Sequence, residues 1–129
     1  MSFASELSNF TVKAASNTEK VFRGSTISLF RNIIRRTPVK EGRLRGNWQT
    51  DLNQPASGEL ERIGEDASIR EAVAVASKAK LDDSIYMVNN LPYARPIEGG
   101  SSTQSPNGMV SVSVAEFNRE VEKQARKLK

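Results

Sequence analysis

The stretch Phe22-Arg-Gly-Ser-Thr-Ile-Ser-Leu-Phe-Arg-Asn-Ile-Ile-Arg-Arg36 carries the pattern that decides the fold of the first third of the chain. Its apolar positions recur at steps of three and four residues, which is the spacing of one helical face. These positions are Phe22, Thr26, Leu29, Phe30 and Ile33, with Ile27 and Ile34 widening the stripe. Pro38 disfavours helical geometry at the residue before it. We therefore predict an amphipathic helix over about residues 8–36, with Gly24 as its weakest position.

Beyond this helix, residues 37–48 are predicted to form a loop, because one proline and two glycines interrupt them. A short strand follows at about residues 47–52, in which alternate residues from Trp48 to Leu52 lie on one side. Residues 53–64 are polar and contain further proline and glycine, so they are predicted to connect two elements.

A second helix is predicted over about residues 67–80, where the sequence is rich in alanine. Ser68 and Glu71 have the spacing of a capping box, in which each side chain bonds a free backbone amide at the helix start. Asp66 is an alternative cap. The small side chains of this helix favour close packing against a sheet or another helix.

Three shorter segments follow the second helix. Residues 84–89 are β-prone and are predicted to form a buried strand. Residues 93–98 fit one helical turn, which a pair of glycines ends. Residues 99–108 are rich in glycine, serine and other polar residues, so they are predicted to form a mobile loop unless a partner orders them.

The last element has the most regular period of the chain. Its face consists of Val110, Val114, Phe117, Val121, Ala125 and Leu128. We predict one helix along this register. The order of elements indicates a single α+β domain over residues 1–129, in which a small short-stranded sheet is packed by a long N-terminal helix, a middle helix and a C-terminal helix.

The composition argues against an enzyme. The chain has no cysteine and no histidine, which removes thiolate nucleophiles, histidine general bases and the commonest ligands of zinc. The adjacent acids Glu65–Asp66 and Asp82–Asp83 are explained by favourable charge at helix starts. We therefore expect a non-enzymatic protein with no cofactor and no metal.

No segment has the pattern of a targeting signal or a membrane span. Residues 1–9 lack the basic start and the apolar run of a signal peptide, and the apolar runs elsewhere are only a few residues long. We expect a protein that is made in a cytoplasm and stays there, or stays in something assembled there, without contact with a membrane.

Charge is distributed unevenly along the chain. Residues 31–45 carry a net charge of +5 and residues 51–71 carry −4. Separate regions of opposite sign favour head-to-tail contact between identical copies or docking on a charged neighbour. An ordinary solvated surface explains the same pattern equally well.

Two segments have both a functional and a structural interpretation. Arg43 and Arg45 beside Trp48 could bind nucleic acid, with the arginines on phosphates and the indole stacked on a base. A lone tryptophan is more often an anchor in a core or an interface. Residues 93–98 are either a contact patch that becomes ordered on assembly or simply a capped turn.

Taken in order, three segments resemble the small tail-completion proteins of long-tailed bacteriophages. Thr37-Pro-Val-Lys-Glu-Gly-Arg-Leu-Arg-Gly-Asn-Trp48 resembles their "TPVxTGxLRxSW" turn. Asn89-Asn-Leu-Pro-Tyr-Ala-Arg-Pro-Ile-Glu-Gly-Gly100 resembles their "NxxPYAxxxExG" segment. Gln104-Ser-Pro-Asn-Gly-Met109 resembles the "QAPxGM" sequence that opens their last helix. The long helix before the first motif is also similar, and the likeness extends from about Phe22 to Phe117.

The resemblance implies a minor structural protein of the virion, located at the neck or the upper end of the tail after assembly in the host cytoplasm. It implies action with the tail terminator, the head-completion (stopper) protein and the tail tube, as several copies in a ring, and it leaves open a contact with DNA. It also implies that the first motif and the loop 99–108 are contact elements. Together with the contact interpretation of residues 93–98, the predicted protein-interaction residues are Arg36, Lys40, Arg43, Leu44, Arg45, Trp48, Tyr93, Arg95, Ile97 and Glu98.

Overall fold

The computed structural model describes residues 3–39, 42–100 and 108–128, with side chains from residue 16 onward. The elements in chain order are α1 (Phe3–Arg36), α2 (Arg43–Gly46), β1 (Trp48–Leu52), α3 (Glu65–Ser77), β2 (Ile85–Asn89), α4 (Ala94–Glu98), α5 (Val110–Ala115) and α6 (Phe117–Arg126). Most of these residues are helical and the strands form one small sheet, so the predicted α+β class is confirmed. None of the described helices is long and apolar enough to cross a membrane.

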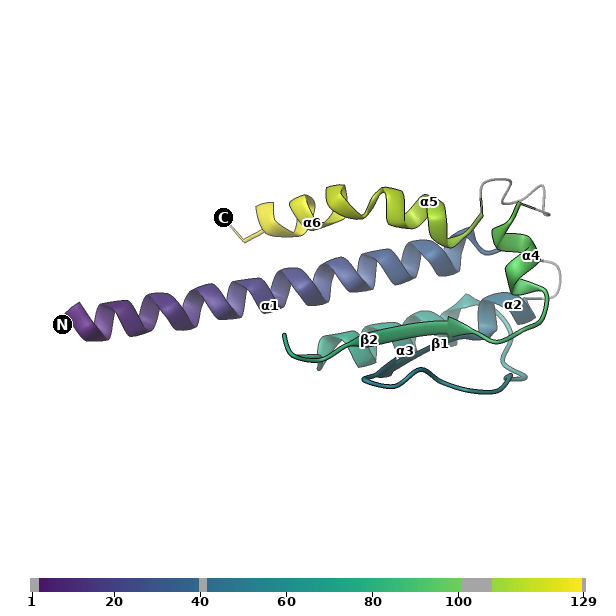
Figure 1. Ribbon diagram of the computed structural model, residues 1–129, viewed down its shortest axis with the longest axis horizontal. Coiled ribbons are helices and arrows are strands. Elements are labelled where there is room, and N and C mark those ends of the chain that lie inside the picture. Colours follow the sequence, from purple (N-terminus) through teal and green to yellow (C-terminus); the bar gives the residue numbers. More distant parts are fainter. Residues whose placement is uncertain (1–2, 40–41, 101–107, 129) are drawn as a thin grey trace.

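Helix α1 forms the axis of the molecule. Helices α5 and α6 lie along one side of it, and α3 with the two-stranded sheet lies on the other side (Figure 1). At 1.5 Å per residue, the 34 residues of α1 span about 50 Å. Its N-terminal end extends past the other elements, whereas its C-terminal end lies among α2, α4 and α5 (Figure 1).

The predicted first helix is confirmed, although it begins at Phe3 and so includes five more residues than expected. Its end at Arg36 agrees with the prediction from Pro38. Gly24 does not interrupt it. A Cβ atom at Gly24 would lie 2.6 Å from Oε1 of Gln124, so this glycine lies where α6 packs against α1.

The two strands are antiparallel, and Trp48 pairs with Asn89 at one end while Leu52 pairs with Ile85 at the other. The strand predicted at residues 84–89 is confirmed as β2. The prediction that it is buried is wrong, because all five of its residues keep some exposure. Both strands lie at an edge of this two-stranded sheet, but Glu71 and Arg62 cover the outer edge of β1, whereas no described residue bonds the outer edge of β2.

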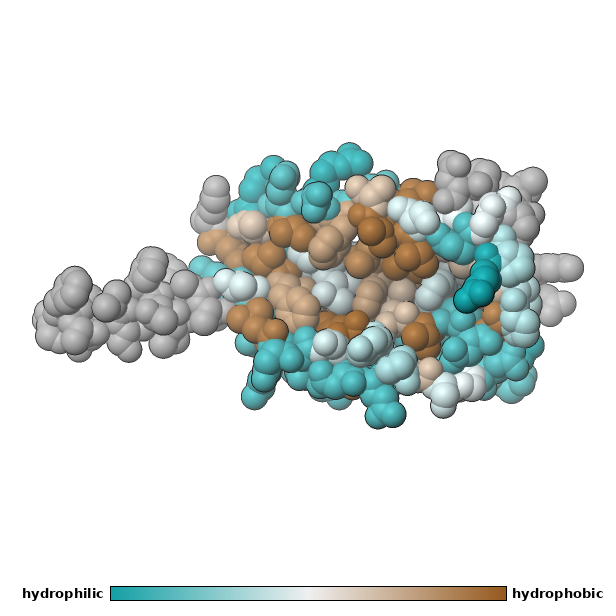
Figure 2. Space-filling view, viewed as in Figure 1, coloured by the Kyte–Doolittle hydropathy of each residue, from teal (hydrophilic) through white to brown (hydrophobic). Residues whose placement is uncertain are grey.

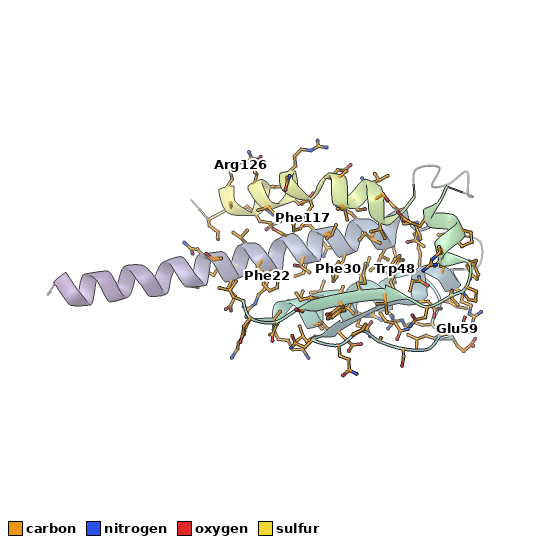
Figure 3. All side chains as sticks on the ribbon, viewed as in Figure 1. Phe22, Phe30, Trp48, Glu59, Phe117 and Arg126 are labelled. Carbon is orange, nitrogen blue, oxygen red and sulfur yellow. The ribbon has the colours of Figure 1, made fainter. Side chains whose placement is uncertain are left out.

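The core lies where the last turns of α1 meet α2, the sheet and the start of α5. Figure 3 shows Phe30 and Trp48 between α1 and the sheet. The buried cluster consists of Phe30, Ile33, Ile34, Leu44, Trp48, Ala72, Leu91 and Met109. On one face of the molecule, apolar side chains also gather in a band between β2 and the last two helices (Figure 2). Apolar surface is therefore only partly enclosed in the core.

Two local predictions on either side of β1 are corrected. The loop predicted at residues 37–48 contains the short helix α2, whose first residue follows Gly42 in a left-handed conformation (φ 78°). The middle helix begins at Glu65 after Gly64, so neither Ser68 nor Asp66 is its cap. Ser68 instead donates to the carbonyl of Arg45 at 2.8 Å. The predicted capping box fails because both of its side chains bond to distant parts of the chain.

The single C-terminal helix that we predicted is in fact two helices, with the break at Glu116. Arg36 of α1 bonds Ser113 Oγ at 3.0 Å and Glu116 Oε1 at 2.9 Å at this break. The break changes the buried face. Ser113 is buried, whereas Val114, which the period placed on that face, is 52% exposed.

The turn predicted at residues 93–98 is confirmed as α4. Pro96 is tolerated because it lies in the first turn of this helix, where its missing amide has no partner inside the helix. The predicted mobile loop 99–108 falls mostly on residues 101–107, which lie outside the described residues.

Candidate interaction surface

The described parts of the three segments that carry the resemblance meet at one end of the molecule. We call this the motif end and define it as the described residues within 37–48, 89–100 and 108–113, together with Ile63, which lies against Gly42. The Asn89 side chain donates to the carbonyl of Leu44 at 2.8 Å, which joins the first segment to the second. The Glu98 carboxylate accepts the amide of Met109 at 2.8 Å, which joins the second to the third. Leu44, Leu91 and Met109 also share the buried cluster.

The first segment is held by hydrogen bonds around Thr37, and the two that involve its hydroxyl are buried. The Trp48 indole donates to Thr37 Oγ1 at 2.8 Å, and Thr37 Oγ1 donates to the carbonyl of Ile33 at the same distance. Arg45 Nε donates to the carbonyl of Thr37 at 2.7 Å, and Arg45 Nη2 donates to the carbonyl of Arg35 at 2.7 Å. These bonds satisfy carbonyls that the end of α1 would otherwise leave without partners.

Two residues that the sequence did not single out anchor the connection after β1. Asn47 is fully buried, and its side chain donates to the carbonyls of Arg43 and Leu60 and accepts the amide of Leu60. Arg62 donates to the carbonyls of Gly46 at 2.8 Å and Trp48 at 2.7 Å. The polar character of residues 53–64 was the only sequence signal for these bonds. The partner atoms belong to the backbone, so no residue type in the sequence marks them.

Gly46 shows how closely this connection lies against α2. A Cβ atom at Gly46 would meet the carbonyl oxygen of Arg62 at only 2.0 Å and the amide nitrogen of Ile63 at 2.9 Å. The obstructing atoms belong to the backbone, so they cannot rotate away as a flexible side chain could. Gly46 is therefore a packing requirement of this fold.

Glu98, the last residue of α4, fixes the start of α5, although the two helices are separated in sequence. Its carboxylate accepts hydrogen bonds from the amides of Met109, Val110 and Ser111 and from the Ser111 hydroxyl. Burial by itself raises the pKa of Glu98, but the bonds from Ser111, Val110 and Met109 outweigh burial and hold the pKa below its ordinary value. Glu98 therefore acts as a charged cap supplied from another helix.

Several of the predicted contact residues have structural roles. Leu44 and Trp48 lie in the core, and Trp48 is only 5% exposed, so its ring has no free face to stack on a base. Ile97 packs against the same core while half-buried. Arg36 and Arg45 bond to other parts of the chain. These five residues position the motif end more than they form its surface.

Other side chains form the surface of the motif end. Arg43 and Arg95 are exposed in part or in full, and Tyr93 is exposed by almost half. Two exposed apolar residues that the sequence did not predict join them: Val39, and Ile63, which is 70% exposed. Ile63 lies over Gly42, because a Cβ atom at Gly42 would meet Ile63 Cγ2 at 2.9 Å. Lys40, also predicted, lies outside the described residues.

The oppositely charged regions of the sequence face each other in the fold. Glu65 lies 3.6 Å from Arg45 and 3.8 Å from Arg35, and Glu61 lies 3.7 Å from Arg43. Much of the predicted charge separation is thus neutralised within one chain, which weakens the basis for head-to-tail attraction between copies.

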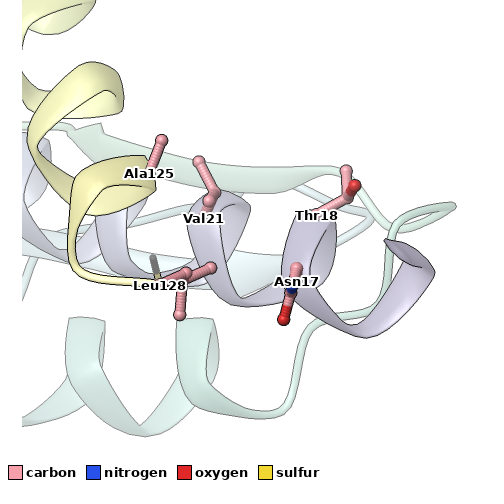
Figure 4. Close-up of a pocket in the computed structure, with 5 residues that line it drawn as sticks. All are labelled: Asn17, Thr18, Val21, Ala125 and Leu128. Carbon is pink, nitrogen blue, oxygen red and sulfur yellow. The ribbon is translucent and has the colours of Figure 1, made fainter. Parts of the chain in front are cut away.

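The opposite end of the molecule has a shallow, open hollow where α6 lies against α1. Figure 4 shows its lining, which consists of Asn17, Thr18, Val21, Ala125 and Leu128. We call this the far end and define it as residues 17–28 with residues 117–128. Within the described ranges, no three carboxylates come together as a metal site would need.

No protein-family model, curated protein or solved structure matches the chain.

Proposed function

We propose that this chain is a structural, non-enzymatic virion protein that acts in tail completion and head–tail joining at the neck of a long-tailed bacteriophage. The observation that carries the proposal is the convergence of three separate segments at the motif end. Asn89 bonds the first segment and Glu98 bonds the third, so the second segment links both.

Residues shared with the resembling motifs have specific roles in this convergence. Thr37 and Trp48 of the first motif bond each other in the core, and Gly42 adopts the left-handed conformation from which α2 begins. Glu98 of the second motif caps the helix that the third motif opens, next to the buried Met109. A chance likeness spread over three short segments would give no reason for such mutual contacts, and this supports the family resemblance.

The surface of the motif end suits a contact with other proteins. Exposed Tyr93, Val39 and Ile63 provide apolar area, and Arg43 and Arg95 provide charge around it. Tyrosine and arginine are enriched where interfaces bind most strongly. We propose that this end contacts the tail terminator, the head-completion protein or the tail tube, with several copies arranged in a ring.

The first experiment is electron microscopy of lysates from a phage whose gene for this chain has been disrupted. The proposal predicts filled heads lying apart from tails of finished length, and a normal gene supplied in trans restores joined particles. Mass spectrometry of purified virions should detect the chain. Joined, infectious particles without the chain would refute the proposal.

A second stage of the same experiment tests the surface. A Tyr93→Ala, Arg95→Glu variant removes exposed groups at the motif end, and we expect it to fold but fail to restore joining. The matched control is Arg126→Glu, a charge reversal at an exposed residue of α6, which should restore joining fully. Arg45 is unsuitable for this test because its bonds to Thr37 and Arg35 serve folding.

A further inference from the structure

The outer edge of β1 is closed by side chains. Asn53 N donates to the carbonyl of Ser84 at 2.7 Å, so in the alternating pattern of an antiparallel pair the amide of Thr50 points away from β2. That amide donates to Glu71 Oε1 at 2.9 Å. The carbonyl of Trp48 accepts Arg62 Nη2 at 2.7 Å. Another strand could not bond this edge without displacing both side chains.

The outer edge of β2 is open. The same alternation directs the backbone N–H and C=O groups of Ile85 and Met87 away from β1. Among the described residues, none bonds these groups. The strand reads Ile-Tyr-Met-Val-Asn and has neither a charge nor a proline, the features by which natural edge strands usually resist pairing.

Apolar surface lies beside this open edge. The band in Figure 2 runs between β2 and the last two helices. Half-buried side chains in the elements that border it include Leu29 of α1, Ile85 and Met87 of β2 and Val110 of α5, all of which pack against the core from its rim. Val114 of α5 is exposed by more than half. A partner on this face would therefore cover both backbone groups and apolar side chains.

We propose that the open edge of β2 pairs with β2 of a second copy of this chain, antiparallel about a two-fold axis through Met87. An extended strand is needed to bond the edge, and the described part of another copy offers β2 alone, because its β1 edge is closed. Two neutral β2 strands meet without repulsion, and the pairing brings two apolar bands together. The result is a four-stranded sheet. This contact overlaps the motif end at Asn89 and Val110, and it does not depend on the proposed role in the virion.

The proposed register places Tyr86 opposite Val88 of the second copy on the outer face of the new sheet. Tyr86 is 41% exposed and Val88 is half-buried, so both positions accept substitutions better than the core does. Like charges directly opposite each other destabilise a strand pair, and opposite charges stabilise it. A pair of substitutions at these positions can therefore test the register itself.

The first test measures the unmodified chain by sedimentation and by amide hydrogen exchange over a range of concentrations. We expect a dimer to form as concentration rises, with slowing exchange at Ile85 and Met87. Tyr86 and Val88 bond to β1, so their amides should exchange slowly at every concentration. A chain that stays monomeric up to about 1 mM, or exchange at Ile85 and Met87 that is independent of concentration, would overturn the proposal.

The second test compares two double variants that differ only in the charge placed at position 86. Tyr86→Lys with Val88→Lys sets lysine opposite lysine twice, and we expect the dimer dissociation constant to rise about tenfold or more. Tyr86→Glu with Val88→Lys sets glutamate opposite lysine twice and should dimerise at least as well as the unmodified chain. Circular dichroism checks that both variants fold. The exchange experiment uses the unmodified chain, so its result does not depend on either variant. A dimer that tolerates both lysines would refute the β2 contact.

Discussion

The motif end and the far end hold the same helix, α1, in different ways. At the motif end, arginine, asparagine and glutamate side chains bond backbone atoms of distant segments, as Arg45 does with Thr37 and Arg35. At the far end, α6 lies on α1 through half-buried apolar side chains and a long bond of 3.4 Å from Gln124 to Ser28. Bonds to backbone atoms hold the joined elements in one relative position, because the backbone cannot rotate away as a side chain can. The contact at the far end leaves side chains that can adjust.

This difference predicts which positions tolerate substitution without a large loss of stability. A buried polar network is costly to disturb because any group left without a partner pays its full desolvation cost. Flexible side chains at a helix–helix contact can repack at a smaller cost. Four substitutions, each measured by urea unfolding followed by circular dichroism, test the difference in order of decreasing effect.

Gly46→Ala should have the largest effect, a loss of about 3 kcal/mol or more in the free energy of unfolding. Its Cβ would meet the backbone of Arg62 at 2.0 Å, so the connection after β1 would have to move. The matched control is Gly58→Ala, where φ is 80° but no described atom lies within 4 Å of the added carbon. Its cost should be about 1 kcal/mol, from backbone strain alone. Equal costs at the two sites would contradict the close packing inferred at Gly46.

Trp48→Phe should cost about 2 kcal/mol, since it removes the buried bond to Thr37 Oγ1 and leaves a small void. Tyr93→Phe is the control, because it deletes one polar group from an exposed ring and should change stability by less than about 0.5 kcal/mol. If Trp48→Phe were as mild as its control, the indole bond would not be important to the motif end.

Glu98→Gln should cost about 1 kcal/mol at pH 7, an effect that partial exposure to solvent keeps small. The pKa of Glu98 is lower in the folded chain than in the unfolded chain. Its contribution is therefore fully present above the ordinary glutamate pKa and is lost as pH falls through the folded value. The stability difference between the two proteins should shrink as pH falls below the ordinary glutamate pKa. A difference that stays constant with pH would mean that the charge of Glu98 plays no part.

Gly24→Ala should have the smallest effect, between neutral and a gain of about 0.5 kcal/mol. Alanine favours the helix over glycine by up to about 1 kcal/mol. Against this, the new Cβ would displace Oε1 of Gln124, which is the end of a flexible side chain and can turn aside. A loss as large as that of Gly46→Ala would show that the far end is as rigid as the motif end.

The sequence predicted most elements but few of their contacts. Pro38 made the end of α1 predictable, and alternation at residues 48–52 and β-prone residues at 84–89 made the positions of β1 and β2 predictable. The spacing of Ser68 and Glu71 matched a local cap, yet those side chains bond Arg45 and Thr50, which are distant in sequence. Local patterns contain no information about such partners.

The candidate site was predictable only in part, for a related reason. Arginine and tryptophan in a glycine-rich loop suggest a surface, but burial of Trp48 and the internal bonds of Arg45 follow from how α1 meets the sheet. Tyr93 and Arg95 were predicted to belong to a contact patch and do lie on the surface. Ile63 was missed because a single apolar residue in a polar connection has no period to reveal its exposure.

The clamp by Glu98 has a practical consequence for labelling the protein. The Glu98 carboxylate bonds the amides of residues 109–111. The backbone before residue 101 and the backbone after residue 107 are therefore held together by bonds that do not involve residues 101–107. Lengthening a connection between ends already held together adds little entropic cost. An epitope or a small fluorescent tag spliced between residues 103 and 104 should therefore leave the fold of the described residues intact, and would supply a visible marker for the isolated protein.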